Sequence, residues 1–451
     1  MRSKQTPGLA RLGTPQLGSS HRADVRELES LPSVQADRPR LFVAMVVALL
    51  LCSNAACGAR GPADPATGPL GAIGGGEGNE AGDHATVCGG SHNAASAYHA
   101  AIGGGSYNVA SVGHSVVGGG LENTASGSMA TVGGGWGNAA THVDATVGGG
   151  RGNVANGRHA TVAGGLVNAA KRGATVAGGS YNTAAANAAI AGGSYNAGDG
   201  YHASIGGGAG NEASAKYTTV SGGLGNRATA IYATVSGGRG NAASGNYASV
   251  AGGLSNDAGS DYSFASGRRA SIAASHPGVF MHADSNDQDF TSAAPNEFAV
   301  RATGGVRLVT AIDSEGNPLV GVVLPAGSGA WSSLSDRAAK ENVVPADPQL
   351  VLSLLAELPI STWSYAGQDS SVRHIGPMAQ DFHAAFGAGE DDRHISTVDA
   401  DGVALAAIQA LYGMVKERDV QMAALEERIA ALERACRADA IVPATGGKVA
   451  R

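Results

Sequence analysis

Single β-branched residues recur at a fixed period over a long central part of the chain. They follow one another every 14 or 15 positions, and an asparagine lies six positions after each of them. The thirteen apolar positions are Ile73, Val87, Ile102, Val117, Val132, Val147, Val162, Val176, Ile190, Ile205, Val220, Val235 and Val250. A repeat with one apolar residue per unit predicts a stack of rungs, each of which is stable only against its neighbours.

The rest of each repeat indicates how one rung is folded. A segment similar to Ala-Thr-Val is followed by a run of glycines, which favours a turn with positive φ, and then by Asn-x-Ala-Ser. We therefore expect two short extended segments and two turns per rung, in a mainly β, parallel β-roll solenoid. The asparagines either hydrogen-bond from rung to rung or occupy left-handed turn positions. They are Asn79, Asn93, Asn108, Asn123, Asn138, Asn153, Asn168, Asn182, Asn196, Asn211, Asn226, Asn241 and Asn256.

The apolar content of one rung predicts an oligomer. One valine and a few alanines, at ~25 cal/mol per Å² of buried apolar area, contribute only a few kcal/mol per rung. Ordering each residue of the backbone costs ~1–2 kcal/mol. We therefore expect three chains to bring their valine columns together on a shared axis, as a homotrimer.

A second column of residues lies three positions before the apolar column. Stacked imidazoles raise the hypothesis of a metal site, whereas flat rings at the spacing of β-strands favour a packing ladder. Because the column changes from histidine to tyrosine along the chain, we favour the packing ladder and expect no metal. Its members are His84, His99, His114, Met129, Asp144, His159, His202, Tyr217, Tyr232 and Tyr247.

The pattern changes after residue 268. Residues 278–330 are expected to form short strands, and an apolar run near residues 351–365 is expected to form a helix. Heptads near the end of the sequence predict a coiled coil. Ile408, Val415, Met422, Ile429 and Cys436 take one seam position, and Leu411, Arg418, Leu425 and Leu432 take the other.

Composition and charge narrow the functional classes. Glycine accounts for 70 of the 451 residues, and the formal net charge is −7 with no block of Lys or Arg. Nucleic acid is therefore not an expected partner, since phosphate binding needs a concentrated basic surface. Four cysteines do not encode a disulfide framework, and we expect no cofactor.

An apolar segment near the N-terminus is typical of an export signal. Residues 41–52, LFVAMVVALLLC, follow two arginines and precede small residues, which suits a signal peptide better than a membrane span. Cys57 lies after Ala55-Ala56 and is a candidate for lipidation, although Asn54 stands at position −3 of a partial lipoprotein motif. A buried apolar helix is the alternative.

One pair of residues in the C-terminal third carries catalytic potential. Ser335 and Lys340 are five positions apart in SDRAAKEN. A serine hydroxyl becomes a nucleophile when a base takes its proton, and a lysine serves as that base only when burial makes it neutral. Burial in an assembled domain would therefore switch the reaction on. In the alternative interpretation Ser335 is the N-cap of a helix, with Asp336 in its first turn.

The repeats resemble the head of YadA-like trimeric autotransporter adhesins. The resemblance rests on the repeat period and on the spacing between the Val/Ile and Asn columns over residues 73–264. It implies a left-handed parallel β-roll wound from three chains and a role in surface adhesion.

The C-terminal third resembles the intramolecular chaperone domain that ends phage endosialidases, tail spikes and related fibres. The matching features are SDRAAKEN, HIGPMAQDF, the pair Trp363 and Tyr365, and the closing heptads. The resemblance implies a domain that trimerises the fibre and then cuts itself off before the serine. Ser335 would be the nucleophile, Lys340 its base and Asp336 a support of the site geometry. The cut bond would join Leu334 to Ser335. Where the family usually has arginine, this chain has Ala338.

These observations predict seven segments along the chain. They are an N-terminal extension with a signal or lipoprotein-like segment (1–57), a linker (58–70), a β-roll head (71–268), a neck or cap (269–334), a small α+β chaperone domain (335–404), a coiled coil (405–437) and a disordered tail (438–451).

The expected function is that of an exported homotrimeric fibre at the cell surface or outside the cell. Its partners would be its own copies and a host-surface, matrix or glycan ligand, with outer-membrane attachment through the N-terminus. The alternatives are a prophage-derived tail fibre, a fibre whose trimerisation domain does not cleave, and a polysaccharide hydrolase. The scattered carboxylates of the repeats do not favour a hydrolase.

Overall fold

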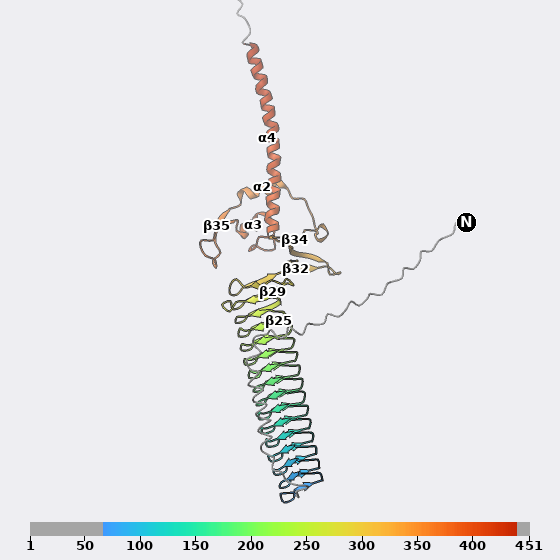
Figure 1. The fold of residues 1–451 in the computed structure, drawn as a ribbon. Helices are drawn as coiled ribbons and strands as arrows, with labels where there is room; N and C mark the ends of the chain where they lie inside the picture. Colours follow the sequence, from blue (N-terminus) through green and yellow to red (C-terminus); the bar gives the residue numbers. More distant parts are fainter. Residues whose placement is uncertain (1–65, 440–451) are drawn as a thin grey trace, which may run out of the picture. The chain divides into compact units, whose positions relative to one another are not determined.

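The computed structural model describes residues 66–439 and divides into two compact units between Arg301 and Ala302. Each unit is described on its own. The N-terminal unit is a solenoid of two parallel sheets, with 16 and 15 strands (Figure 1). Successive strands of the chain alternate between the two sheets, so each turn of the solenoid adds one strand to each sheet. This confirms the predicted β-solenoid.

Most strands are two residues long. The first sheet contains β1 (Ala72–Ile73), β3 (Thr86–Val87), β5 (Ala101–Ile102), β7 (Val116–Val117), β9 (Thr131–Val132), β11 (Thr146–Val147), β13 (Thr161–Val162), β15 (Thr175–Val176), β17 (Ala189–Ile190), β19 (Ser204–Ile205), β21 (Thr219–Val220), β23 (Thr234–Val235), β25 (Ser249–Leu254), β27 (Phe264–Arg268), β29 (Phe280–Ala283) and β31 (Phe298–Arg301). The second contains β2 (Glu80–Ala81), β4 (Ala94–Ala95), β6 (Val109–Ala110), β8 (Thr124–Ala125), β10 (Ala139–Ala140), β12 (Val154–Ala155), β14 (Ala169–Ala170), β16 (Thr183–Ala184), β18 (Ala197–Gly198), β20 (Glu212–Ala213), β22 (Arg227–Ala228), β24 (Ala242–Ala243), β26 (Asp257–Ala258), β28 (Ala270–Ile272) and β30 (Phe290–Thr291).

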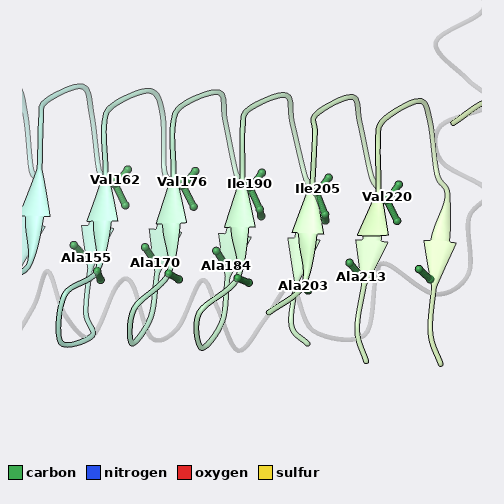
Figure 2. Close-up of a cluster of buried hydrophobic side chains, with 14 of the residues drawn as sticks. Ala155, Val162, Ala170, Val176, Ala184, Ile190, Ala203, Ile205, Ala213 and Val220 are labelled. Carbon is green, nitrogen blue, oxygen red and sulfur yellow. The ribbon is translucent and has the colours of Figure 1, made fainter. Parts of the chain in front are cut away.

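The valine column lies inside the solenoid of a single chain. Val162 pairs in register with Val147 and Val176, and all three are 0% exposed. Figure 2 shows this column facing the alanines of the second sheet, including Ala155 and Ala170. The expectation of a shared axis made of three valine columns is therefore wrong. Because alanine is small, the two sheets approach closely enough for one valine per rung to fill the narrow interior.

The asparagines form a buried ladder, as one of the two predicted alternatives required. Asn123 donates its side-chain amide to the carbonyl oxygens of Gly119 (2.9 Å) and Gly135 (2.8 Å), and its side-chain oxygen accepts the backbone N–H of Asn138 (3.0 Å). A side chain at Gly120 would place its Cβ only 2.2 Å from the Gly135 oxygen, and φ there is +94°. The glycine-rich turn thus leaves space for the ladder.

The part of the second column from His202 to Tyr247 forms a stacked ladder of rings at the turns of successive rungs. The rings of Tyr217, Tyr232 and Tyr247 stack with centroids 4.9 and 5.1 Å apart. These residues have φ between 59° and 60°, a left-handed backbone conformation that is uncommon for tyrosine and that the turn at this position requires. The predicted packing ladder is therefore confirmed for these rings. In residues 66–439, no group of three or more His, Cys, Asp or Glu residues could hold a metal ion.

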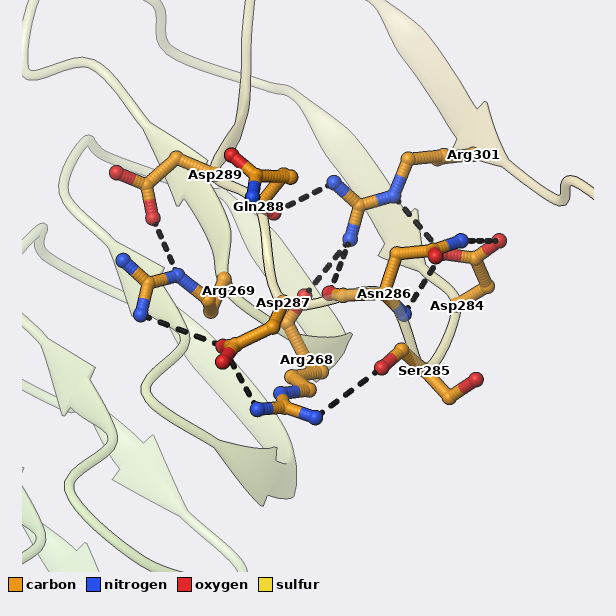
Figure 3. A network of polar contacts seen from close by, with 9 residues as sticks. All are labelled: Arg268, Arg269, Asp284, Ser285, Asn286, Asp287, Gln288, Asp289 and Arg301. Atoms are coloured by element: carbon orange, nitrogen blue, oxygen red, sulfur yellow. Dashed lines mark hydrogen bonds and ion pairs between the residues drawn. The ribbon is translucent and has the colours of Figure 1, made fainter.

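The two sheets continue to Arg301, into the segment expected as a neck. Around the last turns, the loop of residues 284–289 is held by arginine side chains (Figure 3). The ion pairs join Arg301 to Asp284 (2.9 Å), Arg268 to Asp287 (2.7 Å) and Arg269 to Asp289 (2.7 Å). The Arg301 guanidinium also donates to the carbonyl oxygens of Asn286 and Gln288. This network fixes a loop that belongs to no strand.

The C-terminal unit combines small sheets with helices. One antiparallel sheet has three strands, and the other has two. The elements are β32 (Gly305–Ile312), β33 (Pro318–Pro325), β34 (Ser332–Ser333), the 3-10 helix η2 (Arg337–Ala339), α2 (Pro348–Glu357), β35 (Ser361–Trp363), β36 (His374–Gly376), α3 (Ala379–Phe386) and α4 (Thr397–Asp439).

The helix α4 contains all the predicted heptads. Among the helices of residues 66–439, it alone is long and apolar enough to cross a membrane by length and composition. Helices of soluble proteins pass the same test, so this is weak support for a membrane span.

Candidate self-cleavage site

The site begins where β34 ends. Ser332 and Ser333 pair with Val323 and Val322 of β33, and the backbone N–H of Leu334 donates to the Gly321 oxygen at 2.9 Å. The chain then leaves the sheet at Ser335 and enters η2. The predicted cut bond thus lies at the junction between a strand and a 3-10 turn.

Asp336 caps this turn. Its side-chain oxygen accepts the backbone N–H of Ala338 at 2.8 Å, and the backbone N–H of Lys340 donates to the Arg337 oxygen at 3.2 Å. The alternative interpretation, in which Ser335 is the N-cap, is therefore wrong. Because Asp336 caps the turn, the Ser335 hydroxyl is available for another partner.

The turn brings the two candidate catalytic side chains together. The Lys340 Nζ lies 2.7 Å from the Ser335 Oγ, within hydrogen-bonding distance. A nucleophile and its base need this proximity before a proton can pass between them. The structure therefore gives the pair a workable geometry, while their catalytic roles stay a prediction.

The electrostatic setting of the pair is that of an open surface. Both Ser335 and Lys340 are exposed in one chain, as is Ala338. A lysine acts as a base only without its proton, and water stabilises the protonated form. One chain alone does not provide the burial that this chemistry requires.

The other residues that carry the resemblance gather in the hairpin of β35 and β36. Trp363 pairs with His374 across the hairpin, with the two rings stacked 4.7 Å apart, and Tyr365 meets the Trp363 ring edge at 4.8 Å. In the following helix α3, Phe382 is buried and packs against Phe386. These motif residues have structural roles in holding the hairpin and helix.

The C-terminal unit has almost no core of its own. Among its described residues, the buried apolar side chains are Leu358, Phe382, Ala407 and Ala410. In contrast, the apolar heptad residues of α4 are about half exposed or more. They are Ile408, Leu411, Val415, Met422, Leu425, Ile429 and Leu432. Exposed apolar area on this scale marks an interaction surface.

The predicted lipidation residue, Cys57, lies outside the described residues. Arg418 lies in the described part of α4 and is exposed, at the seam position where the sequence predicted a polar interruption.

A comparison with protein families matches residues 335–389 to the family described as chaperone of endosialidase, a peptidase family designated S74. The match begins at Ser335, the residue that would follow the cut bond. No curated protein matches the chain. Residues 335–389 are therefore similar to the assembly domain of an endosialidase-type or tail-fibre-like trimeric fibre. A chaperone domain of this family implies self-association into a homotrimer.

Proposed function

We propose that the chain forms an exported homotrimeric surface fibre with an adhesive or structural role. Its C-terminal domain assembles the trimer and then cuts itself off before Ser335. The observation that carries this proposal is the 2.7 Å contact between Ser335 and Lys340 at the first residue of the matched chaperone segment.

Trimer assembly is supported by the uneven distribution of buried surface. The solenoid buries its valines within one chain, whereas α4 leaves its heptad residues in water. A helix with apolar residues at both seam positions is stabilised when equivalent helices cover them. The C-terminal unit therefore gains most from self-association.

A separate assembly domain also solves a problem of register. Each rung of the solenoid pairs with its neighbours in nearly the same way, so three such rods could align at several offsets of similar energy. Seams in α4 are interrupted at Arg418, which distinguishes one alignment from the next. The domain can set the alignment and is not needed afterwards.

The proposed cut uses the hydroxyl of Ser335 against the carbonyl carbon of Leu334. Neutral Lys340 takes the hydroxyl proton while the Oγ–C bond forms, and it gives the proton to the Ser335 nitrogen as the C–N bond breaks. This leaves an ester between Leu334 and the Ser335 oxygen. Water then hydrolyses the ester, which yields a Leu334 carboxylate and restores the serine hydroxyl.

Assembly would control this chemistry through burial. When neighbouring subunits cover the exposed Lys340, the charged form of its amine loses solvation, and a larger fraction of the amine is neutral and can act as the base. The cut would then follow folding of the trimer, so that incorrectly assembled chains keep their chaperone segment.

The experiment is intact mass with native oligomeric state for the wild type and three variants. We expect the wild type to be cut before Ser335, and Ser335→Ala and Lys340→Ala to stay whole, with all of them trimeric. Ser333→Ala is the matched control because it removes a neighbouring hydroxyl, and it should be cut as the wild type is. A wild-type trimer that stays whole would refute the cleavage but not the fibre.

A prophage-derived tail fibre is the second candidate, because the matched family is described as chaperone of endosialidase and resembles the end domains of phage tail proteins. The two candidates differ in location. Cell-surface protease treatment and fractionation of producing cells should find the exported fibre outside the cytoplasm, whereas a tail fibre would accumulate inside until assembly. A cytoplasmic chain would overturn the export proposal.

A further inference from the structure

The residues before the proposed cut bond form the outer strand of a sheet. In β34, Ser333 and Ser332 pair with Val322 and Val323, and the Leu334 N–H continues the ladder to the Gly321 oxygen at 2.9 Å. A chain held in this way has its backbone extended and fixed up to the residue whose carbonyl carbon would be attacked. The next residue, Ser335, already contacts Lys340.

Gly321 occupies a crowded place in the middle of this sheet. A Cβ built there would lie 2.4 Å from the Leu308 oxygen and 3.2 Å from the Val309 Cα. The pairing of β32 and β33 is irregular between Val309 and Ala311, next to this point. A side chain at Gly321 would therefore push β33 away from β32 and move the oxygen that receives the Leu334 N–H.

We propose that Gly321 is a positioning residue for the self-cleavage reaction, because its carbonyl oxygen holds Leu334 in a substrate strand presented to Ser335 and Lys340. This inference rests on the cleavage proposed above and adds a determinant outside the matched segment. The strand holds the scissile peptide in place before reaction, so the attack on the carbonyl carbon needs little further ordering.

The fixed strand also accounts for the fate of the new end. When the bond after Leu334 breaks, the hydrogen bond from its N–H to Gly321 remains, and so does the pairing of Ser332 and Ser333. The new carboxyl end therefore stays in the sheet while the segment from Ser335 onward is released.

The test compares Gly321→Ala with Gly329→Ala. Gly329 lies in the connection between β33 and β34, and a Cβ there would meet nothing within 4 Å. We expect both variants to be trimeric by native mass. Gly321→Ala should cut at least about tenfold more slowly than the wild type, as small displacements of reacting groups do, whereas Gly329→Ala should match it.

A second measurement reads the strand itself and does not depend on cleavage. In the uncut Ser335→Ala background, the Leu334 amide should be protected from hydrogen exchange, and adding Gly321→Ala should accelerate that exchange while Gly329→Ala leaves it unchanged. If wild-type chains stay whole, the cleavage proposal fails, and the exchange result still decides whether Gly321 holds the strand.

A pair of variants at Leu334 covers the case in which Gly321→Ala does not assemble. Leu334→Pro removes the N–H that donates to Gly321, and Leu334→Ala keeps it. Slow cutting in the proline variant alone supports the proposal. Equal cutting by both, or wild-type cutting by trimeric Gly321→Ala with an unprotected Leu334 amide, would overturn it.

Discussion

Asn108 donates its side-chain amide to the side-chain oxygen of Asn93 at 3.0 Å, and its backbone N–H donates to the same oxygen at 3.1 Å. Both asparagines are 0% exposed. Their hydrogen bonds join consecutive rungs in the interior, where an unpaired polar group is costly. The bond from the backbone N–H to the preceding asparagine recurs along the column, so the ladder and the valine core together stabilise the solenoid within one chain.

Replacement of a single asparagine should weaken the rungs around it. In Asn123→Ala, the Gly119 oxygen and the Asn138 N–H lose their partner, at ~1–3 kcal/mol for each group left unpaired, while the Gly135 oxygen keeps its bond from the Leu121 N–H. Hydrogen exchange should accelerate locally in the neighbouring rungs. Asn156→Ala is the control because Asn156 is exposed, and it should change nothing. Equal effects of the two variants would contradict a structural ladder.

The same substitution at two adjacent residues of β13 should be disruptive at one and tolerated at the other. Val162→Asp buries a carboxyl in the apolar interior and should unfold the surrounding rungs, whereas Thr161→Asp places it on the outer face of the sheet. Hydrogen exchange of the full chain and its soluble yield measure both. If Val162→Asp leaves the rungs protected, the valine column is not inside the solenoid.

Asp257 should make the solenoid less stable at neutral pH. Burial raises the pKa of its carboxyl from the usual 3.8, and its Oδ1 has no hydrogen-bond partner. The folded state therefore binds the proton more tightly than the unfolded state. Stability from this group falls as pH rises from about the unfolded pKa through the higher folded pKa, and the deficit persists above it.

The variant Asp257→Asn removes this pH dependence. Its denaturation midpoint should exceed that of the wild type at pH 7, and the difference should shrink in acid as the wild-type carboxyl becomes protonated. Thermal or urea unfolding at several pH values measures this. A difference that grows toward acid would show that the Asp257 charge is stabilised in the fold.

Charged residues in the seam of α4 should prevent assembly. The double variant Leu425→Lys with Ile429→Lys places two ammonium groups where apolar side chains are expected to meet, and we expect a monomer that stays uncut. The solenoid of this monomer should keep its hydrogen-exchange protection, because its core lies within one chain.

The matched control for the seam is Glu427→Lys, two positions after Leu425 and outside both seam positions. Native mass spectrometry should find it trimeric and cut. A trimeric seam variant would show that α4 is not needed to assemble the subunits.

The repeat period made the solenoid predictable. It did not predict whether the valines face the interior of one chain or an axis shared by three chains. The sequence shows that Val162 recurs in phase, yet it does not show how closely Ala155 and Ala170 allow the facing sheet to approach. The small apolar area of valine and alanine predicts too little core for one chain, whereas in a narrow roll the small size of alanine lets the two sheets close over the interior.

The sequence carried a signal that the left-handed turn position is the residue before the asparagine and not the asparagine itself. The residue immediately before the asparagine is glycine in several rungs, such as Gly137 and Gly210, and the structure gives these positions φ of 62° and 64°. Tyr107 takes the same conformation elsewhere, with φ of 56°. A column that alternates between glycine and larger residues was the available signal.

For the candidate site, the five-residue spacing predicts that Ser335 and Lys340 can meet, but it does not show the turn that joins them. Asp336 caps this 3-10 turn, whereas the alternative interpretation of the sequence placed the cap at Ser335. The pairing of Leu334 with Gly321 joins residues that are 13 positions apart through a strand of two residues, too short to be detected by its pattern.

The most direct test of the account follows cleavage and assembly together after dilution of the chain from denaturant. Intact mass and native mass are recorded over time at several protein concentrations. The account predicts that cut chains form only after trimers do, and that dilution below the concentration needed for trimers leaves whole monomers. Cleavage of monomers at a rate independent of concentration would contradict the claim that assembly activates Ser335 and Lys340.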